Sequence, residues 1–304
     1  MSSALFSIIT PCYRGTATLR RAYESLAAQY GGAIQFEWIL VDDFSDDNNQ
    51  TVALIEELCR VAPFPTKTVF LKKNYYGSRS TSVGAAVATG EYVLILDQDD
   101  MIAKDALRIF KELIDKYSSV ANVIGICGRC VDMQGRLIGT RMPRDEILAN
   151  ELEIRHVYKT RGEMWQCTRR EIVQEYFSDF VPGDVNGYAW TRIARKFQYV
   201  YTDRIVRQYD TGNPLSVSNT RKLGNIDAKI KLLHYYLVNN QDYLERDRFS
   251  LVMYLQQYLR LTSHIGLSLN VAISKVAPQQ RYWAFAIAPL ARLRAALDRT
   301  LKRV

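Results

Sequence analysis

Short apolar runs alternate with stretches of helical spacing along the first third of the chain. Four runs predict strands buried inside a sheet: FSIIT from residue 6, FEWILV from residue 36, KTVFL from residue 67 and EYVLIL from residue 91. Apolar residues three and four positions apart predict helices from about residue 17, around 52–59, over 78–89 and over 103–117. This alternation indicates an α/β fold, with a Rossmann-type, mostly parallel sheet flanked by helices on both faces.

Polar residues gather where the predicted strands end. The first strand ends in TPCY (residues 10–13), the second in Asp42 and Asp43, and the fourth in DQDD (residues 97–100). In such sheets ligands bind beyond the carboxyl ends of the strands. Three aspartates within four positions repel one another unless a cation lies among them. Capping of the next helix explains only one of them, so the cluster favours a bound divalent cation.

No glycine-rich phosphate loop accompanies these carboxylates, because the chain contains neither GxGxxG nor GxxxxGK[ST]. A site without such a loop can bridge the phosphates of a nucleotide to its carboxylates through Mg²⁺ or Mn²⁺. The three histidines are too scattered for a histidine metal site. The CGRC stretch from residue 127 fits a strand better than a zinc or redox site, because no second cysteine pair exists.

Composition and charge divide the chain into two regions. With 304 residues and 48% hydrophobic residues, it can bury a full core. No apolar run approaches the roughly 20 residues of a membrane span, and the first predicted strand begins too early for a signal peptide, so we expect a cytoplasmic location. Residues 221–304 hold 14 Lys and Arg against 5 Asp and Glu, whereas residues 1–220 hold 26 against 27. The net charge of +8 therefore belongs to the C-terminal region.

Four stretches resemble glycosyltransferases of family 2, which have the GT-A fold. They are SIITPCYRG from residue 7, WILVDDFSDD from residue 38, NYYGSRSTSVGAAVATGEYVLILDQDD from residue 74 and VPGDVNGYAWTRIARK from residue 181. Each motif alone is weak, but their order and spacing are specific and cover about residues 5–215. The resemblance implies a GT-A nucleotide-sugar-binding catalytic domain over residues 1–220, followed by a helical C-terminal region over residues 221–304.

The resemblance also implies donor contacts at the strand ends. Pro11 and Tyr13 would line the nucleotide pocket, and Asp42 would accept a hydrogen bond from the base. Asp97 and Asp99 would be the two acids of the Asp-x-Asp motif, which serve the ribose and the metal.

A further metal contact and a phosphate contact are expected nearby. Asp100 is the second metal contact, so Asp99 and Asp100 are the expected ligands of Mn²⁺ or Mg²⁺. The family commonly has an Arg-Asn pair in the helix before GEY, whereas this chain has Thr81 and Ser82 there. Arg79 is therefore the candidate arginine for the diphosphate, with a solvated helix charge as the alternative.

Glycosyl transfer also needs a base for the acceptor hydroxyl. Asp184 takes the family's acidic position and is the predicted general base, although it can also cap the following helix. Sugar faces stack on aromatic rings, so Trp165 and Trp190 are candidate sugar contacts, with core burial as the alternative. Arg207 precedes a loop that in the family often closes over the nucleotide, and it is a candidate phosphate contact.

The basic C-terminal region ends in SKVAPQQRYWAFAIAPLARLRAALDRTLKRV from residue 274. Aromatic, leucine and arginine residues combine there into a predicted basic amphipathic helix, which suits an anionic membrane surface. The alternative is a helix packed on the catalytic domain or on a second subunit of a homo-oligomer. Charge confined to an apolar tail argues against nucleic-acid binding.

The motifs and the charge pattern predict an inverting, metal-dependent glycosyltransferase. It would move a sugar from a nucleotide diphosphate donor, with UDP preferred, to a glycan or lipid-linked acceptor in cell-envelope polysaccharide synthesis. The expected place is the cytoplasm, with peripheral attachment to the inner face of the plasma membrane. Two alternatives stay open: a nucleotidyltransferase that makes the sugar nucleotide, and a non-catalytic relative that binds a nucleotide or glycan, which Thr81 and Ser82 favour.

Overall fold

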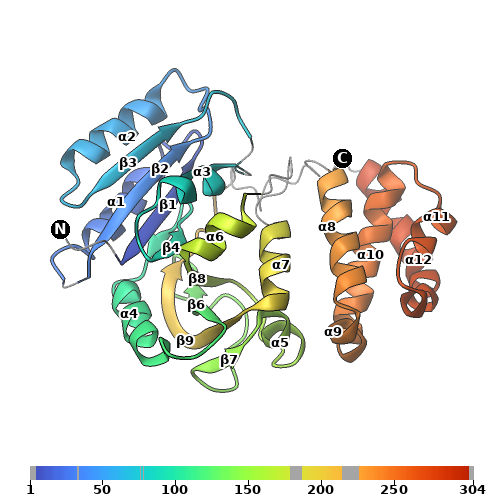
Figure 1. Cartoon of the computed structure of the whole chain (residues 1–304). Helices are drawn as coiled ribbons and strands as arrows, with labels where there is room; N and C mark the ends of the chain where they lie inside the picture. The colour runs from blue at the N-terminus through green and yellow to red at the C-terminus, as the bar shows by residue number, and fades with distance from the viewer. Residues whose placement is uncertain are drawn as a thin grey trace. The chain divides into compact units, whose positions relative to one another are not determined.

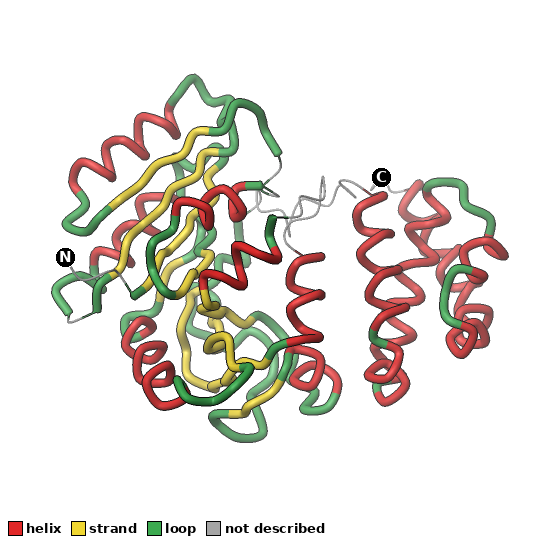
Figure 2. Tube along the Cα trace, in the orientation of Figure 1, coloured by secondary structure: helices red, strands yellow, loops and turns green. Residues whose placement is uncertain are grey.

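The computed structural model describes residues 5–32, 34–75, 77, 79–178, 187–213 and 226–300. The chain forms two compact units. The first consists of residues 1–151, 160–180 and 192–213, and the second of residues 152–159, 181–191 and 214–304. In the part of the chain that the structure describes, all strands lie in the first unit, whereas the second consists of helices (Figure 2).

The first unit is an α/β domain, as the sequence predicts, and most of its elements are labelled in Figure 1. Its strands are β1 (Phe6–Cys12), β2 (Phe36–Asp42), β3 (Thr66–Phe70), β4 (Tyr92–Ile95), β5 (Met101–Ile102), β6 (Val123–Val131), β7 (Ile147–Ala149), β8 (Met164–Arg169) and β9 (Gln198–Gln208). Its helices are α1 (Leu19–Ala27), α2 (Gln50–Val61), α3 (Ser80–Val87), α4 (Ala106–Tyr117) and α6 (Arg170–Tyr176), while α5 (Glu151–His156) and α7 (Gly187–Lys196) cross the boundary between the units.

The sheet has the order β3-β2-β1-β4-β8-β6-β9-β5, with β7 paired to β9. β3, β2, β1 and β4 are mutually parallel, and the register sets Phe6 opposite both Phe36 and Tyr92. β8 runs antiparallel to β4 and β6, and β9 runs parallel to β6. The mostly parallel sheet that the sequence predicts is thus confirmed. β8 runs in reverse between β4 and β6, and the short strands β5 and β7 run antiparallel to β9.

Helices cover both faces of the sheet. On one face α1 and α4 bury their apolar stripes, which include Leu19, Leu26 and Phe110, in one core with Trp38 of β2. On the other face α3 lies so close to β1 that a Cβ atom at Gly84 would come 2.5 Å from Ile9 Cγ2. This contact explains the small residues of α3, because a larger side chain at that position would push the helix off the strand.

The second unit is a helical bundle made of α8 (Ile226–Asn239), α9 (Gln241–Arg246), α10 (Arg248–His264), α11 (Leu269–Ser274) and α12 (Pro278–Thr300). α10 contributes the buried side chains Leu251, Leu255 and Tyr258 to its apolar core. His156 bonds to Asp247 (Nδ1 to Oδ2, 2.9 Å) and to the Tyr236 hydroxyl (2.7 Å), which fastens segment 152–159 to the bundle. None of the helices described combines enough length and apolar character to span a bilayer.

Candidate active site

Six strands end at one edge of the sheet. β1, β2, β3 and β4 are parallel, and β6 and β9 share their direction because the reversed β8 lies between β4 and β6. This edge therefore carries Tyr13 after β1, Asp43 after β2, residues 97–100 after β4 and residues 209–213 after β9, and β8 begins there just after Glu163. The predicted gathering of polar residues at the carboxyl ends is confirmed.

The DQDD stretch forms a turn that separates its aspartates. The Leu96 amide donates to Ile9 O at 2.9 Å, and the Asp100 amide closes the turn by donating to Asp97 O at 3.1 Å. The Asp97 side chain is 52% exposed at the sheet edge, Asp99 is partly exposed, and Asp100 is only 1% exposed. Asp97 and Asp99 are thus accessible to a ligand, whereas Asp100 points into the protein.

Gln98 connects this turn to the end of β1. Its Oε1 accepts the Tyr13 amide at 3.0 Å, and its Nε2 donates to Tyr13 O at 2.8 Å. A Cβ atom at Gly15 would come 2.5 Å from Gln98 Oε1, so glycine leaves room for the amide. The side chain between the two motif aspartates therefore fixes the backbone of Tyr13 next to them.

Tyr13 is 36% exposed and is held at the edge by Asp46. Its hydroxyl donates to Asp46 Oδ1 at 2.8 Å, and Arg14 Nε pairs with the same oxygen at 2.6 Å. The hydrogen bonds from Arg14 and Tyr13 hold the pKa of Asp46 well below its usual range. The carboxylate therefore stays ionised and keeps the tyrosine ring in place.

Asp42 and Pro11 lie on paired strands, since Pro11 is opposite Val41 and Cys12 is opposite Asp42. The Asp42 carboxylate is 3% exposed and accepts the amide and the hydroxyl of Ser45 at 3.1 and 2.6 Å. These bonds shape the turn after β2. The base contact expected for Asp42 stays a prediction, which requires the carboxylate to exchange the Ser45 hydroxyl for the base.

Asp43, which the sequence reasoning left without a role, organises the loop before α3. Its carboxylate accepts the amides of Tyr75 and Gly77 at 2.8 and 2.6 Å. Arg79 follows this loop at the start of α3, is exposed, and places its guanidinium 5.2 Å from the Tyr75 ring centre. Arg79 is thus exposed beside this loop, and its contact with the diphosphate stays a prediction.

Arg207 of β9 is buried among three carboxylates. Its Nη1 lies 3.2 Å from Asp100 Oδ2 and 3.8 Å from Asp97 Oδ2, and its Nη2 lies 3.3 Å from Glu163 Oε2. Burial raises the pKa of Asp100 to about 8, although Arg207 lowers it. With 5% exposure the guanidinium is committed to these carboxylates. We therefore correct the expected phosphate contact: Arg207 braces the acidic turn from behind.

The segment after β9 is fastened to the same turn. Asp100 Oδ1 accepts the Asp210 amide at 2.8 Å, and Asn213 Nδ2 donates to Asp99 Oδ2 at 2.7 Å. Arg21 of α1 joins both parts, because its Nη2 donates to Asp210 Oδ2 at 2.6 Å and to Asp99 O at 2.5 Å. The position of Asp99 thus depends on residues from three separate elements.

Comparison with known proteins identifies the family of the chain. Residues 7–177, more than half of the chain, match the glycosyl transferase family 2. The chain belongs to this family. The resemblance seen in the motifs is thereby confirmed for the region that carries DQDD.

Individual relatives cover the family 2 region only in part. Poly(ribitol-phosphate) beta-N-acetylglucosaminyltransferase TarS of Staphylococcus aureus is 33% identical over 130 residues, which are 41% of this chain and 22% of TarS. The chain thus spans about a fifth of the length of the first curated relatives it matches. The crystal structure of TarS 1–349 in complex with UDP-GlcNAc superposes with a TM-score of 0.60 at 18% identity, over 98% of this chain and 92% of that one. Mannosyltransferase PcManGT from Pyrobaculum calidifontis, in complex with GDP-Man and Mn²⁺, gives a TM-score of 0.59 at 14% identity, over 97% and 86%.

The acidic turn has the donor chemistry for a divalent metal, but not with the ligand pair expected from the family 2 resemblance. Among the described residues, no group of three His, Cys, Asp or Glu side chains forms a metal site. Mg²⁺ is commonly held by one or two carboxylates together with substrate phosphates and water, and Asp97 and Asp99 fit that demand. Both oxygens of Asp100 face Asp210 N–H or Arg207. We therefore replace Asp100 by Asp97 in the expected pair.

The structure gives different outcomes for the other candidates from the family 2 motifs. Trp165 is 3% exposed, donates from Nε1 to Ile95 O at 2.6 Å and packs 5.6 Å from the Phe110 ring, so its expected sugar contact is wrong and it is a core residue. Trp190 lies on α7, in the part of that helix assigned to the second unit, and its sugar contact stays a prediction. Asp184, the predicted base, lies outside the described residues.

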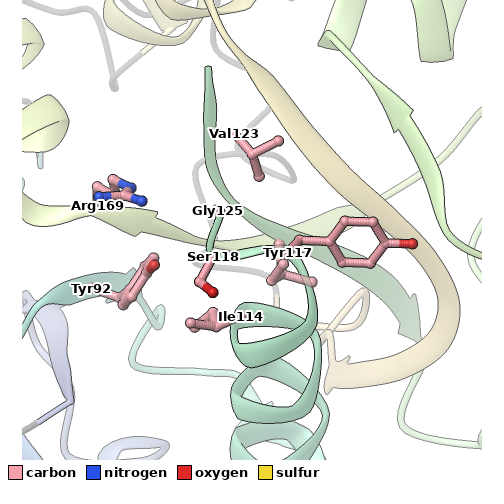
Figure 3. A pocket seen from close by; sticks show the side chains of 8 residues that line it. Tyr92, Ile114, Tyr117, Ser118, Val123, Gly125 and Arg169 are labelled. Carbon is pink, nitrogen blue, oxygen red and sulfur yellow. The ribbon is translucent and has the colours of Figure 1, made fainter. Parts of the chain in front are cut away.

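A small pocket at the opposite edge of the sheet is not part of this family 2 site. Figure 3 shows the side chains of Tyr92, Ile114, Val123 and Arg169 around it. Tyr92 and Val123 begin β4 and β6, so the pocket lies at the amino-terminal ends of these strands. It has room for little more than a water molecule.

Gln98, Arg21 and Asn213 are among the residues of the family 2 site that the sequence did not reveal. Gln98 could have been noticed as the middle residue of Asp-x-Asp. No motif or charge pattern marks Arg21 or Asn213, because their contacts join segments about 80 to 190 residues apart in the chain. Only the sheet order brings these segments together.

Proposed function

We propose that this protein is an inverting, metal-dependent glycosyltransferase that uses a nucleotide diphosphate sugar, with UDP as the nucleotide. The observation that carries the proposal is the placement of Asp97 and Asp99 at the carboxyl edge of the sheet beside Tyr13, in a chain of family 2. In α/β sheets this edge is where nucleotides bind.

The relatives suggest the first donor and acceptor to test. TarS is named for transferring N-acetylglucosamine to poly(ribitol-phosphate), and it has been crystallised with UDP-GlcNAc. We propose UDP-GlcNAc as the first donor and a cell-envelope glycan or lipid-linked polymer as the acceptor class. The proposed place is the cytoplasmic face of the plasma membrane, where such acceptors are assembled.

Each residue has a separate task in this proposal. Tyr13 presents its ring to the base, Arg79 contacts the diphosphate, and Asp97 and Asp99 hold Mn²⁺ or Mg²⁺. When bound, the metal neutralises negative charge on the leaving nucleotide diphosphate. Asp184 accepts the proton of the acceptor hydroxyl, and one direct displacement inverts the configuration of the sugar carbon.

The test is metal-dependent release of UDP from a panel of UDP- and GDP-sugars, with and without Mn²⁺. Asp99→Asn should lower the metal-stimulated rate on the order of 100-fold, because an amide binds a divalent cation poorly. Asp115→Asn is the matched control, since Asp115 is exposed on α4 and pairs with Lys111 of the same helix at 2.6 Å. If Asp99→Asn keeps the full metal-stimulated rate, the assignment of the site is wrong.

Asp184→Asn separates binding from chemistry. The variant should bind the donor as the unmodified protein does, and it should lose transfer on the order of 100-fold or more. A nucleotidyltransferase would instead release pyrophosphate from UTP and a sugar phosphate. A non-catalytic relative would bind UDP with Mn²⁺ in calorimetry and turn over none of the donors.

A further inference from the structure

α12 packs on the helical bundle through its smallest side chains. Ala284, Ala288, Ala291 and Ala295 are all buried, and they recur three or four residues apart on one face. Arg294 Nη1 donates to Gln256 of α10 at 2.8 Å beside this alanine stripe. The alanine stripe uses one face of a 23-residue helix. Trp283 and Ile287 add partly buried contacts to the core, whereas the other large apolar side chains of α12 do not belong to it.

Those larger apolar side chains lie on the surface instead. Tyr282, Leu290, Leu293 and Leu297 recur at helical spacing away from the alanine stripe. Phe285 of α12 is also exposed, as are Phe249 and Met253 of α10, the helix that packs against α12. The exposed fractions are 76% for Tyr282, 54% for Phe285, 48% for Leu290, 58% for Leu293, 50% for Leu297, 71% for Phe249 and 47% for Met253. Exposed apolar side chains in such number mark a surface that interacts with a protein or a membrane.

The exposed charges on this helix have one sign. Arg281, Arg292 and Arg299 are exposed along α12. Asp298 is the one acidic residue between Pro278 and Thr300, and it is 3% exposed and pairs with Arg260 at 2.7 Å. The outer surface of α12 thus combines apolar side chains with exposed positive charge.

We propose that this outer surface of α12, with Phe249 and Met253 of α10, docks on an anionic lipid surface. A helix with an apolar face and flanking arginines lies in the membrane interface, where the apolar side chains enter the acyl boundary and the arginines reach the phosphates. A symmetric contact between two copies through the same surface would bring Arg292 of each copy towards the like charges of the other, which disfavours that occupant. Only the purpose of this docking rests on the proposed function: it would bring the enzyme to a lipid-linked acceptor.

The experiment is co-sedimentation of the full chain with vesicles of phosphatidylcholine alone or with about a third phosphatidylglycerol. Each arginine near an anionic surface contributes roughly a fivefold gain in binding. The triple variant Arg281→Gln/Arg292→Gln/Arg299→Gln should therefore bind anionic vesicles on the order of 100-fold more weakly. The matched control neutralises Arg108, Arg136 and Arg141, whose side chains are 64%, 75% and 75% exposed in the first unit. The control should bind as the unmodified protein does.

A second variant tests the apolar part. Leu290→Ser/Leu293→Ser/Leu297→Ser should lower binding by at least about 30-fold, since each leucine is about half exposed and would be covered in the interface. In the unmodified chain, raising NaCl from about 50 to about 300 mM should weaken binding at least tenfold, a test without any folding effect.

Three outcomes overturn the proposal: equal binding to both kinds of vesicle, equal loss in the arginine triple variant and its control, or a leucine variant that dissociates an oligomer while vesicle binding is unchanged. Release of UDP from the donor is measured on the same samples without vesicles. If a variant loses vesicle binding but releases UDP normally, the defect lies in the docking surface. If the unmodified protein releases no UDP, the proposed function is wrong and the docking proposal is unaffected.

Discussion

Gln98→Leu is the substitution that tests most directly whether the acidic turn positions the nucleotide contact. Leucine has nearly the size of glutamine, but it can neither accept the Tyr13 amide nor donate to the Tyr13 carbonyl. The variant leaves Asp97 and Asp99 unchanged. It therefore tests the contribution of the Tyr13 backbone position apart from the contribution of the two carboxylates.

The magnitude follows from the two hydrogen bonds, at 3.0 and 2.8 Å. A neutral hydrogen bond contributes a net of about 0.5–1.5 kcal/mol, and water can replace part of this because both groups lie at the surface. We expect the variant to lose about 1–2 kcal/mol of donor binding free energy, because the donor then has to order the Tyr13 backbone when it binds. That corresponds to a rise of roughly 5- to 30-fold in the donor KM. kcat should change less than threefold, because Gln98 touches no reacting atom.

The assay is steady-state release of UDP at saturating Mn²⁺ over a range of donor concentrations. Gly15→Ala is a second route to the same defect, since its Cβ would come 2.5 Å from Gln98 Oε1 and displace the amide. Combined with Gln98→Leu, it should add little, because both changes break one interaction. Gln174→Leu is the control, as it removes a comparable bond from a side-chain amide to Ala85 O at 2.8 Å.

A donor KM within twofold of the unmodified protein for Gln98→Leu, with a normal melting temperature, would refute the reasoning. Full additivity of Gly15→Ala and Gln98→Leu would refute it as well. A fall in kcat with an unchanged KM would assign Gln98 to the chemical step instead.

Two further predictions concern buried charges of the first unit. Arg207→Met leaves the buried Asp100 without its partner and should lower the free energy of unfolding by about 2–4 kcal/mol. The control Arg136→Met, at an exposed arginine, should change the free energy of unfolding by less than about 0.5 kcal/mol. Urea unfolding followed by circular dichroism measures both. Lys67 and neighbouring hydroxyl and amide donors lower the pKa of Glu37 from 4.5 to about 2 despite its burial, so its stabilisation is complete above pH 4.5 and is lost as the pH falls towards 2. This amounts to about 3 kcal/mol. The stability of Glu37→Gln should therefore be less than that of the unmodified protein at pH 7 and approach it near pH 2.5, and equal slopes for the two proteins between pH 4.5 and 2.5 would contradict this.

The parallel half of the sheet could be predicted because each of its strands is marked locally. FSIIT, FEWILV, KTVFL and EYVLIL became β1 to β4, and the helical spacing from residue 103 became α4. The order of the other strands could not be predicted, since nothing near Trp165 shows that β8 runs against β4. Apolar periodicity fixes which side of a strand is buried, but it does not choose the neighbour.

The same distinction applies to the site: residues marked by their local sequence could be predicted, and residues whose partners lie on other strands could not. The placement of Asp97 and Asp99 at the accessible sheet edge could be predicted because a cluster of carboxylates directly after a strand is visible in the local sequence. Trp165 was misplaced because an aromatic residue on a strand looks alike whether it contacts a sugar or the core, and its hydrogen bond to Ile95 O decides between them. Arg207 was misplaced because its carboxylate partners follow or precede other strands, so its burial among them was invisible in the sequence.

The four residues of DQDD show why the motif needs more than its two outward acids. Asp97 and Asp99 alone would repel each other at the sheet edge, and the turn that carries them has few bonds of its own. Gln98 ties the turn forward to Tyr13, while Asp100 ties it back to Arg207 and to the segment after β9. The two accessible carboxylates are thus held by the two side chains that a ligand does not need to touch. In the proposed metal site the ligands have to be in place before the ion arrives, so we assign this preorganisation to Gln98 and Asp100, together with the contacts of Arg21 and Asn213 to Asp99.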